Sequence, residues 1–503
     1  MRRPTSSLPD LVAPPPAPAD SPGQLAFGKM SAILLVIVAV ALALRFTHLD
    51  RWGLWVDEIF TVQHAGELAD GDINTRSLAY ALSLIGFEAD GVDMIALESD
   101  KVWTWREAGI NEWNIRAPIA LLGGLTILAL GLLAHRSFGS RTTLLLCLLM
   151  ALSPWHLWMS QVGRFYMQLF LLYNVGLLLY YQATEDGQVS RAFGATVAIV
   201  LAFFTTPIAL MIFGVLGLDV VLCRLRRRPS GMRPAFWIIA AVGLALCAAA
   251  VAVTFAGRAE GVAGFIGSPQ PIPVMTMGLV YMVGVPIATL AAFGFRCMWV
   301  GDERLAALLA LSVFLPLAIF VGFNLLGVDT HVRYMFVTLF AWLALAAAGL
   351  DALIAALLPR WGRLAAWIPA LAFLGTFALA DYIYMTGGAG YRGPWREAMA
   401  YVDEHRQPGD LVGGDLVAHL MAQYYLEDSE VLLLPARGTN VDTVTSVGRP
   451  AWLVYRVYQP STGYRVGALE VPGELRAYFN NRIAEPYHAI NVYYYRPPTT
   501  PGD

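Results

Sequence analysis

The sequence predicts a polytopic α-helical membrane protein that ends in a small α/β domain. Of its 503 residues, 57% are hydrophobic and only 14% are charged, whereas soluble domains carry about 25% charged residues. Apolar runs long enough to cross a bilayer recur between residues 29 and 385. Beyond residue 385 the apolar runs shorten and alternate between strand-like and helix-like patterns. We therefore expect a transmembrane domain at 29–385 and an α/β domain at 386–503.

Residues 1–28 are rich in proline, serine and alanine and lack periodicity, which is typical of a disordered tail. The first apolar run contains Ala41-Leu42-Ala43, a pattern that also occurs at signal-peptide cleavage sites. However, the charged start of the chain lies far from this run, and further spans follow. We expect the run to be retained as the first transmembrane helix.

About eleven transmembrane helices are predicted. The apolar runs lie at roughly 29–45, 117–135, 142–159, 162–182, 192–205, 207–223, 235–256, 274–298, 305–326, 334–357 and 364–385. The least certain boundary is the one at Thr205–Pro207, which fits either a tight outer turn or a kink within one longer helix.

The charges of the short loops predict the orientation, because positive residues favour the cytoplasmic side. Arginines gather in three loops of one side, at 136–141, 224–233 and 360–363. This side and the N-terminal tail are predicted to be cytoplasmic, whereas the loop at 46–115 and the α/β domain are predicted to be extracytoplasmic. Only Lys29 and Lys101 are lysines among the 34 basic residues. This arginine bias is typical of a GC-rich bacterial genome and therefore indicates a bacterial inner membrane.

The C-terminal segment is predicted to alternate strands and helices, which indicates an α/β fold. We expect helices at PWREAMAYVDEHR, VAHLMAQYYLED and GELRAYFNN, and strands at LVGG, EVLLLP, AWLVYRV and AINVYYYR. The segment contains no motif that assigns it a function.

Two classes of site are not expected. The net charge of −3 argues against a nucleic-acid partner. The four cysteines lie in or beside apolar runs and lack metal-ligand spacing, so no disulfide framework is predicted. They are Cys147, Cys223, Cys247 and Cys297.

Five arginines lie at outer ends of the predicted spans, where the orientation rule predicts few positive charges. A single arginine there usually anchors a helix at the interface or pairs with a nearby acid. Several together indicate an outward-facing cavity for an anion, and a phosphate suits the forked guanidinium group. Both readings stay open from composition alone. The five are Arg45, Arg51, Arg116, Arg164 and Arg333.

Two of these arginines have polar aromatic neighbours. The sequence could place them in an anion site, or the tyrosines could be ordinary residues of the interfacial aromatic belt. The two groups are Gln161, Arg164 and Tyr166 at the start of the fourth span, and His331, Arg333 and Tyr334 at the start of the tenth.

Asp57 and Glu58 are adjacent acids that follow the first span. Adjacent side chains point about 100° apart on a helix and to opposite faces of a strand, so the pair cannot share one proton. We expect one acid to face the cavity, where a carboxylate could act as general base on a hydroxyl. The other should brace the loop against an arginine. The alternative is a solvated pair without a chemical role.

Four short elements carry a family resemblance through their order along the chain. They are Trp55-Val-Asp57-Glu58, Asn114-Ile-Arg116-Ala-Pro118, Pro154…Gln161-Val-Gly-Arg164-Phe-Tyr166 and Arg333-Tyr334. Together they resemble the GT-C superfamily, specifically the lipid-linked-sugar glycosyltransferases that include protein O-mannosyltransferases and the aminoarabinose transferase of lipid A. Many relatives carry a His-Pro-Pro-Leu-Tyr-like element later in the first loop. No such string occurs between Thr61 and Glu112, so acceptor recognition cannot be carried over.

The resemblance implies an inverting glycosyltransferase that moves a sugar from a polyprenyl-phosphate donor to a hydroxyl of an extracytoplasmic glycan, lipid or protein. It implies a catalytic acid pair at Asp57 and Glu58, with Asp57 as the base and Glu58 beside Arg116. The donor phosphate would be held by Arg164, Tyr166, Arg333, His331 and Tyr334, with Arg45 and Gln161 nearby. No cofactor is required. Some relatives bind a divalent metal, although no ligand cluster in this sequence demands one.

Three other functions compete with this interpretation. A transporter or flippase for a polyprenyl-linked glycan would explain the spans and the outer arginines, but it would not need the acid pair, and inverted repeats are not visible. A glycan polymerase or ligase also carries outer arginines but usually ends without an α/β domain. The third alternative is a non-catalytic membrane protein whose outer domain binds a partner.

Overall fold

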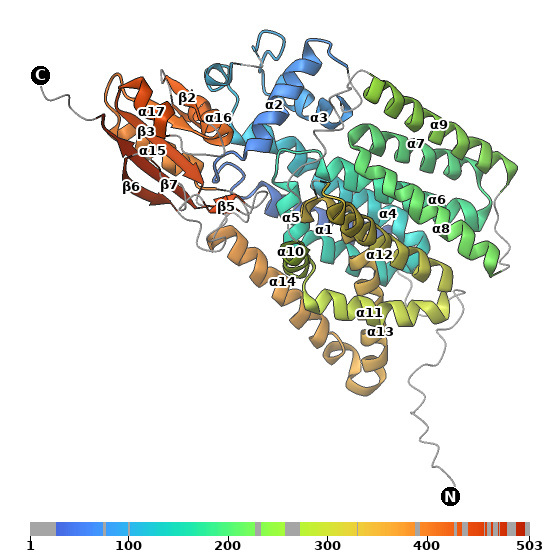
Figure 1. Ribbon diagram of the computed structural model, residues 1–503. Coiled ribbons are helices and arrows are strands. Elements are labelled where there is room, and N and C mark those ends of the chain that lie inside the picture. Colours follow the sequence, from blue (N-terminus) through green and yellow to red (C-terminus); the bar gives the residue numbers. More distant parts are fainter. Residues whose placement is uncertain are drawn as a thin grey trace, which may run out of the picture.

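The computed structural model consists of a large helical body and a smaller sheet-containing unit at the C-terminal end (Figure 1). It describes residues 27–73, 77–98, 101–226, 233–256, 272–328, 330–387, 393–426, 430–434, 441–456, 458–459, 464–465, 471, 473–479 and 489–497. The predicted tail therefore lies almost wholly outside the described residues, as do Arg227 and Arg228 of the predicted cytoplasmic loop.

Twelve of the described helices form the body, with two short 3₁₀ segments between them. The helices are α1 (Phe27–Phe46), α4 (Glu112–Ala151), α5 (Pro154–Ser160), α6 (Tyr166–Asp186), α7 (Val189–Thr205), α8 (Met211–Leu225), α9 (Pro234–Ala256), α10 (Ile272–Val283), α11 (Val285–Gly301), α12 (Glu303–Leu325), α13 (Leu339–Ala365) and α14 (Ile368–Gly387). The 3₁₀ segments are η2 (Pro207–Leu210) and η4 (Val332–Thr338).

Helix α4 is a hairpin of two arms. Gly139 breaks it with φ 74°, a left-handed conformation that glycine adopts readily. The arms pack on each other, since the Cys147 thiol lies 3.8 Å from the carbonyl oxygen of Ile127, twenty residues away. The predicted span at 117–135 lies in the first arm. The span predicted at 142–159 covers the second arm, which ends at Ala151, and most of the separate short helix α5.

The span predicted at 274–298 is not one continuous helix, because the chain bends there by 74° between α10 and α11. Gly284 has φ 81° at the break, and Pro286 follows in the first turn of α11. A proline at that position lacks the N–H that would continue the preceding helix, so the chain starts a new helix instead.

The structure favours a tight turn over a kink between α7 and α8. Arg304, near the start of α12, contacts Glu185 at the end of α6 (2.6 Å) and Asp219 near the end of α8 (2.8 Å). Helix α7 starts beside the end of α6, so α7 leaves this end of the body and α8 returns to it. The chain must therefore turn back at η2.

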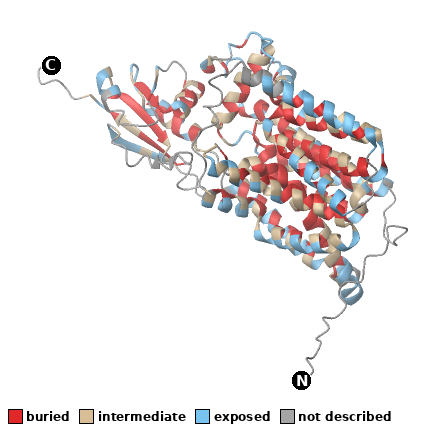
Figure 2. Ribbon diagram, turned by 45° about the vertical axis from the view of Figure 1, so that its right-hand side comes forward, coloured by how far each residue is buried: buried red, intermediate tan, exposed pale blue. Residues whose placement is uncertain are grey.

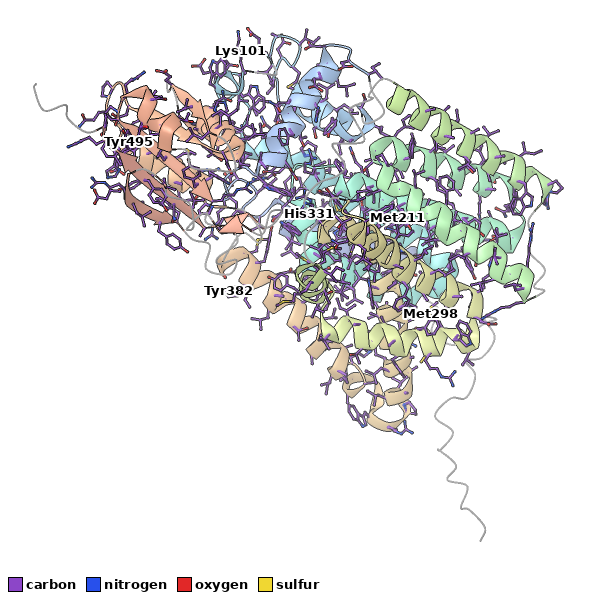
Figure 3. The ribbon with its side chains drawn as sticks, viewed as in Figure 1. Lys101, Met211, Met298, His331, Tyr382 and Tyr495 are labelled. Carbon is purple, nitrogen blue, oxygen red and sulfur yellow. The ribbon has the colours of Figure 1, made fainter. Side chains whose placement is uncertain are left out.

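Within the described residues, six helices are long and apolar enough to cross a membrane, or seven if α10 and α11 count as one broken span. Figure 2 shows exposed residues along the outward faces of the body and buried residues in its interior. Many of the exposed residues are large and apolar. Tyr382 on α14, for example, points away from the body (Figure 3) and is 64% exposed. Such faces fit lipid, and the protein is an integral membrane protein. The count of about eleven spans stays a prediction.

The ends of the helices form two groups. One group is joined by the ion pairs Arg136–Asp186, Arg141–Asp351 and Arg226–Glu303, whose arginines come from two of the loops predicted to be cytoplasmic. The other group includes the ends that carry Arg45, Arg116, Arg164 and Arg333. Figure 3 shows Lys101 of the first long loop at one extremity of the molecule and Met298, near the end of α11, towards the other. Arg164 precedes the start of α6, whereas Asp186, the partner of Arg136, ends it, so the basic loops and the outer arginines lie at opposite ends of the body.

The first long loop contains helices that the sequence interpretation left out. They are α2 (Val56–Ala69), α3 (Ser77–Ala89) and the 3₁₀ turn η1 (Val102–Thr104). Helices α2 and α3 lie between the body and the C-terminal unit in the view of Figure 1.

The C-terminal unit contains a five-stranded mixed sheet of order β2-β1-β3-β7-β6. Strands β2, β1 and β3 are parallel to one another, β7 is antiparallel to β3, and β6 is antiparallel to β7. Its strands are β1 (Leu411–Gly414), β2 (Val431–Leu433), β3 (Ala451–Arg456), β6 (Glu474–Phe479) and β7 (Ile490–Tyr495), and β4 (Tyr458–Gln459) and β5 (Tyr464–Arg465) form a separate pair. Its helices are α15 (Trp395–His405), α16 (Leu416–Tyr425) and α17 (Val441–Val447).

The predicted helix at GELRAYFNN is wrong. Residues 474–479 form the edge strand β6, which pairs with β7 from Glu474↔Tyr494 to Phe479↔Ile490. Gly473 precedes it with φ 116°, and a Cβ there would meet the backbone of Tyr494 at 2.7 Å. Pairing with the distant β7 outweighs the local helical pattern in this segment. Most side chains of this edge strand are exposed, so its sequence lacks the apolar alternation that would identify a strand.

Candidate active site

Glu58 is fully buried and lies at the centre of a dense set of contacts. Arg116, at the start of α4, holds its carboxylate in two places, with Nε 2.8 Å from Oε1 and Nη2 2.7 Å from Oε2. The Trp55 amide donates to Oε2 and the Gly163 amide to Oε1, each at 2.9 Å. A carboxylate held by four donors and shielded from solvent fastens the loop and does not reach a substrate.

Arg116 also binds the backbone of the segment before α2. Its remaining N–H groups donate to the carbonyls of Leu49 (2.9 Å), Trp52 (2.7 Å) and Gly53 (2.8 Å). All five guanidinium N–H groups are therefore used, and the side chain is fully buried. The pair joins the segment before α2 to the start of α4, so the position of α2 is fixed relative to the membrane helices.

Asp57 lies in the first turn of α2 and meets two arginines from distant segments. Its Oδ2 is 3.3 Å from Nη1 of Arg333, on η4. Its backbone carbonyl accepts a hydrogen bond of 3.0 Å from Nη1 of Arg164, which also donates to the Thr61 hydroxyl at 3.2 Å. The side chains of Asp57 and Arg333 are 15% and 20% exposed, which leaves both of them partly accessible.

Aromatic rings orient both guanidinium groups. Arg333 lies over the rings of Trp55 (4.8 Å to the centroid) and Tyr334 (5.5 Å). Arg164 lies over Phe165 (5.0 Å) and more distantly over Tyr80 (6.0 Å). Cation–π contacts of this kind hold a cation without using its N–H donors, so donors stay available for an anion.

Several polar atoms at this point are buried and make no hydrogen bond with the described part of the chain. They are the Nε atoms of Arg164 and Arg333, and Oδ2 of Asp57, which forms an ion pair with Arg333 but no hydrogen bond. Buried polar atoms normally have partners, and those that lack them often mark a ligand site. The cluster of Asp57, Arg164 and Arg333, which we call the two-arginine site, therefore has donors and an acceptor left for a ligand.

The other predicted phosphate residues lie around the same site. Tyr166, the first residue of α6, is buried and interacts electrostatically with Asp57, Arg164 and Arg333. The ring of His331 packs edge-on against Tyr334 at 5.7 Å. The structure thus brings all five proposed phosphate residues to one region.

Arg45 and Gln161 form hydrogen bonds inside the protein. All five N–H groups of Arg45 are used inside the protein, by three backbone carbonyls, Ser160 and His156. Gln161 donates to the carbonyls of Arg45 and Thr47 and accepts from the Tyr384 hydroxyl. Both residues are buried and tie the ends of α1, α5 and α14 together, so neither lies in a position to bind a phosphate.

Two contributors to the site, Thr61 and Tyr80, were missed in the sequence, and Trp55 was noted there as part of a motif without a role of its own. Thr61 lies four residues after Asp57, on the next turn of α2. Helical spacing could have identified Thr61, since residues four apart share a helix face. Tyr80 comes from α3, and no local pattern connects it to Arg164.

The described residues contain no group of three histidine, cysteine or acidic side chains that could hold a metal ion. The metal that the family resemblance allowed stays a prediction without a ligand set.

A family model for dolichyl-phosphate-mannose-protein mannosyltransferases matches residues 107–252, which include Arg116, Arg164 and Tyr166. No curated protein matches the chain.

Solved structures match almost the whole chain. ArnT from Cupriavidus metallidurans in the apo state has a TM-score of 0.59 at 17% identity, covering 92% of this chain and 98% of its own. ArnT bound to undecaprenyl phosphate gives 0.57 at 16% identity with the same coverage. The chain has the GT-C fold. The archaeal oligosaccharyltransferase AglB from Archaeoglobus fulgidus, in complex with an inhibitory peptide and a dolichol-phosphate, gives 0.54 at 11% identity, covering 86% of this chain and 70% of its own. The predicted resemblance to the GT-C superfamily is confirmed.

Proposed function

We propose that this protein is an inverting glycosyltransferase that transfers a sugar from a polyprenyl-phosphate donor to a hydroxyl group of an extracytoplasmic acceptor. The observation that carries the proposal is the two-arginine site, in which Asp57 contacts Arg164, from the turn before α6, and Arg333, from η4. Two structures of similar fold are described as bound to undecaprenyl phosphate and to a dolichol-phosphate. These ligands support a polyprenyl phosphate as the leaving group.

The charges of the site suit a phosphodiester. Glu58 and Arg116 neutralise each other, which leaves Arg164, Arg333 and Asp57 with a combined charge of about +1 at neutral pH. A polyprenyl-phosphate sugar carries one negative charge at its phosphate, and the charge grows as the sugar leaves. Fixed guanidinium groups therefore stabilise the transition state more than the bound donor.

The proposed reaction is one displacement. The acceptor hydroxyl oxygen attacks the anomeric carbon of the donor sugar while the bond from that carbon to the phosphate oxygen breaks. The carboxylate of Asp57 takes the hydroxyl proton, and the polyprenyl phosphate leaves with the bonding electron pair. Attack from the side opposite the phosphate inverts the anomeric centre, as in one-step glycosidases.

The pairing of Asp57 with Arg333 links donor binding to the activity of the base. Nη1 of Arg333 lies 3.3 Å from Oδ2 of Asp57 and so occupies one oxygen of this carboxylate. A donor phosphate that pairs with Arg333 would compete with Asp57 for the same guanidinium. Donor binding then releases the carboxylate for the acceptor hydroxyl, so the base becomes active only when a sugar is present.

We further propose that the two-arginine site faces the extracytoplasmic side of a bacterial inner membrane. The basic loops at the opposite end of the body support this orientation through the positive-inside rule. Nucleotide sugars are absent outside the cytoplasm, which makes a lipid-linked sugar the accessible donor. Hexose and pentose donors both fit this chemistry.

The test uses purified protein in lipid nanodiscs with a panel of polyprenyl-phosphate sugars and hydroxyl acceptors, and it measures the release of polyprenyl phosphate. Asp57→Asn should abolish release, because the amide cannot take a proton. Donor binding should be kept or become tighter, because the amide no longer competes with the phosphate for Arg333. Asp50→Asn is the matched control, since Asp50 is an exposed acid seven residues earlier in the same loop.

Full turnover by Asp57→Asn would remove the proposed base. A transporter or flippase would instead move the intact donor across a vesicle membrane without releasing polyprenyl phosphate. Movement without release in the wild-type protein would therefore replace the enzymatic proposal with that alternative.

A further inference from the structure

Tyr425, the last residue of α16, connects the C-terminal unit to the segment that leads into Asp57. Its hydroxyl oxygen accepts a hydrogen bond from the Leu54 amide at 2.7 Å and donates one to Oε1 of Glu112 at 2.8 Å. One hydroxyl group thus holds both the segment before α2 and the first residue of α4, although it is more than 300 residues away from either in sequence.

A second side chain of the C-terminal unit supports this contact. Nη2 of Arg396, on α15, lies 2.5 Å from Oε1 of Glu112 and donates to the carbonyl of Asp50 at 3.0 Å. Gly53 lies directly beneath both side chains, and a Cβ there would be 3.1 Å from Arg396 and 3.2 Å from the Tyr425 hydroxyl. The segment 50–54 is therefore in close contact with the C-terminal unit.

The segment that Tyr425 fixes continues directly into the two-arginine site. Leu54 is followed by Trp55, the N-cap of α2, whose ring lies under Arg333 at 4.8 Å. Asp57 lies two residues further on, in the first turn of the same helix. A shift of the Leu54 amide would thus move the ring beneath one arginine and the carboxylate beside it.

The hydroxyl group of Tyr425 stays protonated, so it remains a hydrogen-bond donor to Glu112. Burial, with a smaller effect of the Glu112 carboxylate, raises the pKa of the phenol well above its usual range. The proton therefore stays on the oxygen at working pH, and the hydrogen bond to Glu112 persists. The contact behaves as a fixed connection and does not respond to pH.

We propose that Tyr425 is a positioning residue through which the C-terminal unit sets the geometry of Asp57 and Arg333. The effect on turnover rests on the proposed function, whereas the effect on the Leu54 amide does not. On this account the C-terminal unit is needed for the reaction although Tyr425 itself touches no substrate.

The neighbouring Tyr424 provides a matched control. It is buried, and its hydroxyl donates to the carbonyl of Ile110 at 3.2 Å. Tyr424→Phe therefore removes one hydroxyl and one hydrogen bond from the same helix end without touching the segment 50–57.

The experiment compares Tyr425→Phe and Tyr424→Phe in the full-length protein. Hydrogen exchange should become about tenfold faster or more at the Leu54 amide in Tyr425→Phe, as expected for the loss of one hydrogen bond, and stay unchanged in Tyr424→Phe. The turnover number kcat should fall about tenfold only in Tyr425→Phe, while affinity for polyprenyl phosphate changes less than kcat. Equal melting temperatures of the two variants would exclude general destabilisation as the cause.

Two results would overturn the proposal. One is unchanged exchange at Leu54 in Tyr425→Phe, and the other is an equal loss of kcat in both variants. If the wild-type protein released no polyprenyl phosphate with any donor, the proposed function would fail. The exchange rates would still decide whether Tyr425 holds the segment.

Discussion

Replacing Arg116 with methionine should release the segment that leads into α2. The substitution keeps a long apolar side chain but removes the guanidinium that holds Glu58 and the carbonyls of Leu49, Trp52 and Gly53. Glu58 would keep its two amide donors but lose the positive charge that Arg116 supplies. A buried carboxylate without its counter-charge is the main cost of this change.

The size of the effect follows from these contacts. Breaking a buried ion pair by removing one partner costs about 3–5 kcal/mol. The three carbonyls can turn towards solvent once the segment opens, so we add nothing for them. A cost of this size should speed hydrogen exchange in the segment 49–58 by about a hundredfold to several thousandfold, unless global unfolding limits the rate first.

The assay is hydrogen exchange followed by mass spectrometry, with thermal unfolding in detergent as a check on global stability. The matched variant carries Glu58→Gln together with Arg116→Met, which removes both charges. Because replacing a whole buried pair is often nearly neutral, the double variant should exchange more slowly than Arg116→Met alone. Exchange in Arg116→Met within about threefold of the wild type would show that the pair does not hold the loop, and would refute the reasoning.

Two further predictions concern the phosphate and the helix packing. Arg164→Ala should weaken binding of polyprenyl phosphate by about 1.5–3 kcal/mol, the value of a charge-assisted hydrogen bond, and an unchanged affinity in a lipid-binding titration would exclude a direct contact. Gly294→Ala should sharply lower the yield of folded protein in fluorescence-detected size exclusion, because a Cβ on α11 would lie 1.8 Å from the carbonyl oxygen of Leu345 on α13. Gly322→Ala on α12, where a Cβ meets nothing within 4 Å, should keep the wild-type yield, and equal yields for the two variants would contradict the close packing of α11 on α13.

The sequence could identify the charged residues near the site, but it could not tell which of them face a ligand and which are buried inside the protein. Asp57, Arg164 and Arg333 were predicted to share a pocket because their motifs open spans on the same side, and the structure brings them together. Arg45 and Arg116 had the same sequence context, yet both are fully buried with every donor used inside the protein. Burial depends on neighbours far away in the chain, so composition and spacing could not separate these arginines.

The same limit explains where the fold departs from the predicted elements. The break at Gly284 depends on one backbone conformation within an apolar run that looks continuous. The strand at 474–479 depends on its pairing with β7. The contact between Tyr425 and Leu54 joins segments 371 residues apart, and neither residue belongs to a recognisable motif. Local patterns therefore predict which elements exist better than they predict which contacts hold them.

The central claim is that Asp57, Arg164 and Arg333 form one site for the donor phosphate. The most direct measurement is an experimental structure of the protein with bound polyprenyl phosphate. The account predicts phosphate oxygens within hydrogen-bond distance of both guanidinium groups, with Arg333 turned from the Asp57 carboxylate towards the phosphate. A phosphate bound elsewhere, with Arg333 still paired to Asp57, would contradict the account.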